Sequence, residues 1–233
     1  MKSPQDNKPS KIDKQIKSLI AKAEDGNKDA IEKIYQLALS DSSIFELNSI
    51  DSDDLTVFPI LIENQVEIKS KTTQNGFFQT KRQVFKISDY LAIAWIFHKI
   101  YHEPSAPYIY ALAKRMMNIK NIKSAQRWYM TAALMARIDA SRCEDKTAPQ
   151  GILIIESEFT DIKKTLQDKN SFNEAIKFAL QKEEEFKSRS LPSWICSHGI
   201  RAFSGELEYK SEDIWKKERS KIREKYTNQI IND

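Results

Sequence analysis

The chain has 233 residues, of which 40% are hydrophobic and 30% charged, and its formal net charge at pH 7 is +4. These values are ordinary for a soluble globular protein, and the short apolar runs argue against a membrane span. With only 5 glycines and 7 prolines, the composition also disfavours a turn-rich all-β fold and favours long helices.

The first residues and the cysteines indicate the cellular compartment in which the protein is expected. Residues 1–10 predict a disordered leader, and the run KSPQDNKPSK after Met1 has no apolar core of the signal-peptide type. Cys143 and Cys196 are the only cysteines, and a pair this sparse suits buried thiols in a reducing compartment better than a disulfide framework. We therefore expect a cytoplasmic protein.

Two helices are expected before residue 41. Ser10 followed by Asp13 has the spacing of a capping box, and an apolar stripe then runs to Gly26, which can end the helix with a positive φ. A second helix is expected from about Lys28 to Ser40. Together they predict a helical hairpin.

The helical spacing of apolar residues is lost between residues 41 and 87. Rough alternation around Val66 and Ile68, followed by Asn75-Gly76, predicts a small β-hairpin or extended insertion at about residues 56–87. The alternative is that residues 79–87 begin the next helix. An insertion that interrupts a helical scaffold often carries specificity.

Helices resume at Ser88, which is a good N-cap, and continue as a helix pair over residues 106–140. The apolar run ILII at residues 152–155 predicts either a short strand or the buried start of a helix. Two further helices are expected, at about residues 171–189 and 211–230.

Small and aromatic residues recur within residues 107–140 at the spacing of a packed second helix. They are Ala125, Trp128, Tyr129, Ala132, Ala133 and Ala140. This pattern resembles one unit of the tetratricopeptide family, and of its Sel-like relatives in particular. It departs from the family at Ala136, where the family usually has a glycine that turns the chain. The resemblance implies antiparallel helix pairs and binding of a protein or peptide on a helical groove. Because Ala136 replaces the glycine, the helix is expected to run further.

Chemical sites are weakly indicated. His98 and His102 lie four residues apart on an expected helix, but no third ligand is placed, so core-edge histidines are favoured over a metal site. Cys196 and His198 lie in the loop 194–206, where a nucleophilic pair is an alternative to a plain binding loop. We expect no catalytic residue, metal or cofactor.

Partner-binding residues are expected at exposed aromatic and arginine positions, since these side chains dominate interfaces. Trp194 and Trp215 are the predicted exposed anchors, with Arg201 in the glycine-marked loop and Gln74 and Arg82 at the hairpin tip. The basic run at residues 216–225 is diluted by glutamates, which favours a solvated helix face over a nucleic-acid site.

The sequence thus predicts a mostly α protein, with one helical-repeat domain over residues 11–233 that carries the insertion at 56–87. We expect a non-enzymatic module that binds another protein, such as a toxin, an effector or a secretion component. One version is an immunity or antitoxin-like inhibitor of a bacterial toxin. The alternatives are an adaptor or chaperone for a secreted effector, and a hydrolase using the 194–206 loop.

Overall fold

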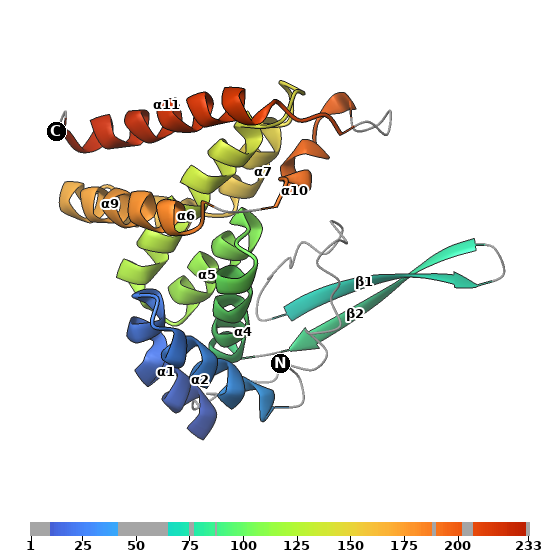
Figure 1. The fold of residues 1–233 in the computed structure, drawn as a ribbon. Helices are drawn as coiled ribbons and strands as arrows, with labels where there is room; N and C mark the ends of the chain where they lie inside the picture. Colours follow the sequence, from blue (N-terminus) through green and yellow to red (C-terminus); the bar gives the residue numbers. More distant parts are fainter. Residues whose placement is uncertain are drawn as a thin grey trace. The chain divides into compact units, whose positions relative to one another are not determined.

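The computed structural model describes residues 10–41, 65–74, 77–86, 88–187, 190–201 and 207–231, and these are mostly helical (Figure 1). Residues 1–9 of the predicted leader lie outside the described ranges. The chain divides into two compact units, residues 1–98 and 99–233. The single domain expected over residues 11–233 therefore spans both units.

The first unit begins with a helix pair that follows its local signals. Helix α1 (Lys11–Glu24) starts at Ser10, whose side chain and that of Asp13 form the expected reciprocal capping box. Gly26 has a φ of 84°, which a glycine adopts without steric cost, and it turns the chain into α2 (Lys28–Leu39). The two helices pack together through buried isoleucines and alanines at positions 16, 20, 23, 30, 31, 34 and 38.

Strands β1 (Gln65–Gln74) and β2 (Phe77–Lys86) pair antiparallel in the region of the expected insertion. Their register runs from Gln65 opposite Lys86 to Gln74 opposite Phe77. The segment 56–64 and the Asn75-Gly76 turn of the expectation lie outside the described residues.

Helix α4 (Asp89–His102) begins where Ser88 predicts it. The Ser88 hydroxyl accepts the Leu91 backbone N–H at 3.1 Å and donates to the Asp13 carboxylate at 2.7 Å. One serine therefore caps α4 and joins its start to the first turn of α1.

In the second unit, α5 (Ala106–Asn118) and α6 (Ile122–Ser141) form the helix pair expected over residues 106–140. Ala113, Ala125 and Ala132 are fully buried, so the two backbones approach closely, and the Trp128 ring fills space beside them. Helix α6 runs past Ala136 to Ser141, in agreement with the longer helix expected from the missing glycine.

Helix α6 is the central element of this unit. Packed on it are α5, α7 (Gln150–Ser157), α8 (Thr160–Thr165), α9 (Lys169–Glu185), α10 (Ser193–Cys196) and α11 (Glu212–Ile231). Helices α9 and α11 also contact each other, and Figure 1 shows them side by side. In the part of the chain described, no helix has both the length and the apolar character to cross a membrane.

Candidate interaction surface

A disulfide joins the end of α6 to α10. Cys143 and Cys196 are bonded, with their Cα atoms 5.4 Å apart. The expectation of two buried thiols is therefore wrong in one respect: the side chains are buried, but they are oxidised. We call residues 142–157, 190–201 and 207–214, which attach around this bond, the crosslinked surface.

Backbone pairing holds a second segment beside the disulfide. Cys143 and Tyr209 form an antiparallel bridge, in which the Glu144 N–H donates to the Glu208 carbonyl at 3.1 Å and the Lys210 N–H donates to the Arg142 carbonyl at 2.8 Å. The Arg142 guanidinium also pairs with Glu212 at 2.9 Å. The start of α11 is thus fixed to the end of α6.

Asp145 connects the loop after α6 to the residues after α10. Its carboxylate accepts hydrogen bonds from the Thr147 hydroxyl, the Arg201 N–H and the Thr147 N–H, at 2.6, 2.8 and 2.8 Å. These bonds favour the charged form and lower the pKa of Asp145. The Thr147 hydroxyl oxygen in turn accepts the Ile200 N–H at 2.9 Å.

Gly199 makes this contact possible. A Cβ atom at that position would lie 2.3 Å from an Asp145 carboxylate oxygen and 2.9 Å from the Asp145 Cβ. The loop 145–147 and the segment 199–201 therefore approach as closely as they do only because residue 199 has no side chain.

Helix α7 completes the crosslinked surface. At Gly151, an added Cβ would lie 3.1 Å from the Ile195 side chain and 3.2 Å from that of His198, so the first turn of α7 lies against α10. The ILII run is helical, and its buried reading is wrong for two of its residues. Ile152 is buried, whereas Leu153 and Ile154 are 67% and 70% exposed.

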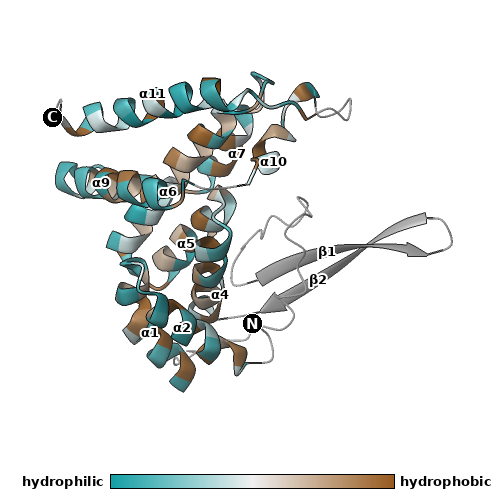
Figure 2. Ribbon diagram, in the orientation of Figure 1, coloured by the Kyte–Doolittle hydropathy of each residue, from teal (hydrophilic) through white to brown (hydrophobic). Residues whose placement is uncertain are grey.

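Exposed apolar side chains are concentrated on the crosslinked surface. Ile200 is 69% exposed, and every large exposed hydrophobic side chain among the residues whose side chains are described lies on this surface. In Figure 2, α11 is mostly teal, and the apolar residues of α10, Ile195 and Cys196, are buried rather than part of the exposed set. Single exposed apolar residues are normal, and several of them on neighbouring segments make this region the candidate binding surface. The full set is Leu153, Ile154, Leu191, Ile200, Leu207 and Ile214.

The two predicted tryptophan anchors are not exposed. Trp194 and Trp215 are 7% and 8% exposed. The Trp194 indole N–H donates to the buried Asp139 carboxylate at 3.0 Å, and that of Trp215 donates to the Ile138 carbonyl at 3.2 Å. Both rings dock their segments onto α6, so their interpretation as exposed anchors was wrong. Burial of these rings depends on tertiary packing, which residue type does not report.

The other predicted partner-binding residues are more widely spread. Arg201 is exposed on the crosslinked surface and pairs with Glu208 at 2.9 Å. Gln74 is the last residue of β1, and Arg82 in β2 lies opposite Lys69 in β1. The structure thus brings Arg201 to the exposed apolar residues, while Gln74 and Arg82 belong to the first unit.

The candidate chemical pairs have ordinary structural roles. The Cys196 sulfur is bonded to Cys143, so it holds no thiolate in this state, and His198 Nδ1 donates to the Trp194 carbonyl at 2.8 Å. His98 stacks on Tyr35 with ring centroids 3.7 Å apart. Over the described residues, no group of three metal-ligating side chains comes together.

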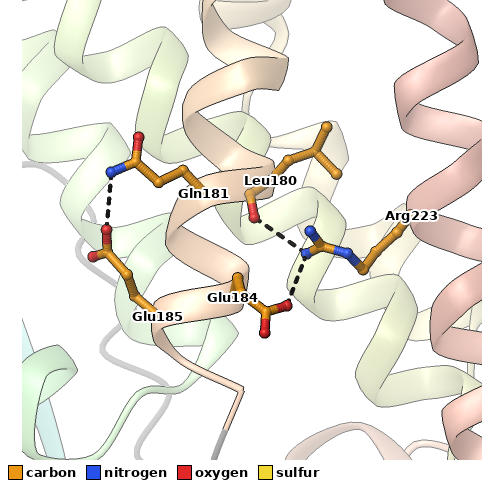
Figure 3. A pocket seen from close by; sticks show the side chains of 5 residues that line it. All are labelled: Leu180, Gln181, Glu184, Glu185 and Arg223. Atoms are coloured by element: carbon orange, nitrogen blue, oxygen red, sulfur yellow. Dashed lines mark hydrogen bonds and ion pairs between the residues drawn. The ribbon is translucent and has the colours of Figure 1, made fainter.

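A separate polar interface joins α9 to α11. The fully buried Glu183 carboxylate receives Arg219 at 2.8 and 2.9 Å and also pairs with Arg223. An open pocket of about 540 Å³ lies beside it, lined by Leu180, Gln181, Glu184, Glu185 and Arg223 (Figure 3). These polar groups already bond one another or their helices: Arg223 donates to the Leu180 carbonyl, and Gln181 donates to Glu185. The pocket is therefore part of a structural interface.

The same interface explains the basic run at 216–225. Arg219 and Arg223 are committed to α9, and Lys221 pairs with Glu218 on its own helix at 3.1 Å. Part of the basic charge in this run is thus neutralised within the protein.

No protein-family model, curated protein or solved structure matches this chain significantly.

Proposed function

We propose that this protein is a non-enzymatic helical scaffold that binds another protein through the crosslinked surface. The observation that carries the proposal is that the large exposed apolar side chains lie on α7 and on the two segments held to the end of α6 by the disulfide, by Asp145 and by the Cys143–Tyr209 bridge. Burying such side chains against a partner is favourable in proportion to the apolar area removed from water.

Rigidity supports the same reading. The segment around Ile200 is fixed through its own N–H and that of Arg201, and α7 is held against α10 at Gly151. A surface that is already ordered loses little conformational entropy when it binds. The exposed Arg201–Glu208 pair supplies charges of both signs beside Ile200. A matching partner presents an apolar contact face with polar groups of both signs at its edge.

The scaffold itself fits the repeat resemblance at residues 107–140, and we propose a degenerate tetratricopeptide or Sel-like relationship on that basis. Within the binding class, an immunity or antitoxin-like inhibitor that covers a toxin's active site is the first candidate. An adaptor or chaperone for a secreted effector is the second. Identification of the bound protein distinguishes the two.

The test compares partner capture by tagged wild-type protein with capture by Ile154→Asp and Ile200→Asp. Each substitution places a charge in the exposed apolar set without touching the buried core. We expect capture to weaken by roughly tenfold or more, as at interface hot spots, with an unchanged circular dichroism spectrum. Asn228→Asp, at an exposed position of α11, is the matched control for added charge. Equal capture by all four proteins would reject the crosslinked surface as the binding site.

A further inference from the structure

The disulfide has the properties of a structural crosslink. Cys143 and Cys196 are the only cysteines of the chain, so no third thiol exists to exchange with the bond intramolecularly. Their side chains are 2% and 3% exposed, which keeps thiols of other molecules from the sulfur atoms. Exchange requires an accessible thiolate attacking along the S–S axis, and this site offers none.

The segment 190–201 depends on this crosslink. Its regular structure consists of α10, which has 4 residues and is too short to be stable alone. The segment is held to α6 and the following loop by the disulfide, the Trp194–Asp139 bond and the Asp145 contact with Arg201. The Ile200 N–H bond to the Thr147 hydroxyl and the burial of Trp194 and Ile195 add to these attachments, and the disulfide is the one among them that reduction breaks.

We infer that oxidation completes the crosslinked surface, and that the protein meets its partner in an oxidising compartment. The inference rests on the proposed function, since it concerns the same surface. Disulfides form and persist in oxidising compartments and are rare where thiols are kept reduced. The inferred compartment replaces the cytoplasmic location expected from the run after Met1 and from the cysteines when they were interpreted as thiols. The partner is thus a protein of the periplasm, the secretory lumen or the extracellular space.

The closing reaction takes place before the two cysteines are buried, and it needs a disulfide donor, such as a thiol–disulfide oxidoreductase in its oxidised form. The thiolate of one cysteine attacks a donor sulfur, breaking the donor's S–S bond and forming a mixed disulfide. The second cysteine thiolate then attacks its partner's sulfur and releases the donor as a dithiol. The chain loses two electrons and two protons, and the donor gains the same two electrons and two protons.

The first test asks whether the bond exists in the cell. Protein from its native cell is quenched in acid, denatured, alkylated with N-ethylmaleimide and weighed by mass spectrometry. We expect no adduct without reductant and two adducts after reduction. Two adducts without reductant would overturn the inference, whatever partner the protein has.

The second test asks what the bond holds. In a Cys143→Ser/Cys196→Ser variant, we expect amide hydrogen exchange of residues 190–201 to accelerate at least tenfold while α9 and α11 keep their protection. Capture of the partner should fall by a similar factor. Unchanged exchange and capture in the variant would overturn the inference. If the oxidised wild type captures no protein, the proposed function fails, and the alkylation result alone decides the redox inference.

Discussion

The α9–α11 interface and the crosslinked surface use opposite chemistry. In the first, charged side chains are buried: Glu183 is fully enclosed between Arg219 and Arg223. In the second, apolar side chains are exposed, with Leu153, Ile154 and Ile200 largely in water. In the first, buried polar groups fix α11 on α9. In the second, apolar side chains remain exposed to solvent. The comparison separates a region that holds the fold from a region available to a partner.

The largest effect is expected from Glu183→Ala. The substitution removes the buried carboxylate that Arg219 and Arg223 share and leaves them only the Glu184 carboxylate, so we expect the free energy of unfolding to fall by roughly 3 kcal/mol. Urea denaturation measures the change. Lys221→Ala, which removes an exposed pair with Glu218, is the control and should cost about 0.5 kcal/mol or less. Equal losses in the two variants would contradict a special role for the buried carboxylate.

Gly199→Ala should have an intermediate effect on the other region. The new methyl group displaces the Asp145 carboxylate and breaks its bond to the Arg201 N–H, which we expect to cost about 1–2 kcal/mol. Thermal unfolding and exchange of the Arg201 amide report the loss. Gly151→Ala is the matched control, because its Cβ would meet neighbours at 3.1 Å and beyond and requires only a small shift. A larger loss of stability in Gly151→Ala than in Gly199→Ala would show that the close contact at Gly199 is not the critical one.

Acid should weaken the charged interface first. Hydrogen bonds from Arg219 and Lys187 lower the pKa of Glu184 from 4.5 to about 2. A carboxylate with a lowered pKa contributes stability that is complete above its unfolded value, near pH 4.5, and is lost as the pH falls toward 2. Comparing wild type with Glu184→Gln by denaturation across this range should show a stability difference that shrinks with falling pH. A constant difference would refute the assigned ionisation.

The smallest effect on stability is expected from Ile154→Asp. Because the Ile154 side chain is already in water, unfolding free energy should change by about 0.5 kcal/mol or less while partner capture falls. The melting temperature, measured beside the capture assay, is the readout. A large drop in melting temperature would show that Ile154 stabilises the fold and is not simply a partner-binding residue.

Local signals were enough to predict much of the helical framework. Ser10, Gly26 and Ser88 act through neighbours three or four residues away, so their capping and turning roles can be read directly from sequence. The buried alanines of α5 and α6 followed from the same short-range periodicity.

The candidate site needed tertiary contacts that no local pattern encodes. Cys143 and Cys196 are 53 residues apart, and nothing in that spacing says that α10 returns to the end of α6. The local sequence around Trp194 and Trp215 does not distinguish a ring that faces water from one that packs on α6. The ILII run did signal residues 152–155 as unusual, but its apolar character alone could not show that Leu153 and Ile154 face outward.

The bond between Cys143 and Cys196 also turns part of the chain into a ring. Helices α7, α8 and α9 all lie between the two cysteines, so the segment that contains them is joined at both of its ends to the end of α6. A protease that cuts once inside this ring opens the backbone without dividing the molecule, because sulfur still joins the two pieces. Such a nicked protein runs as one species on a denaturing gel until reductant separates it into two.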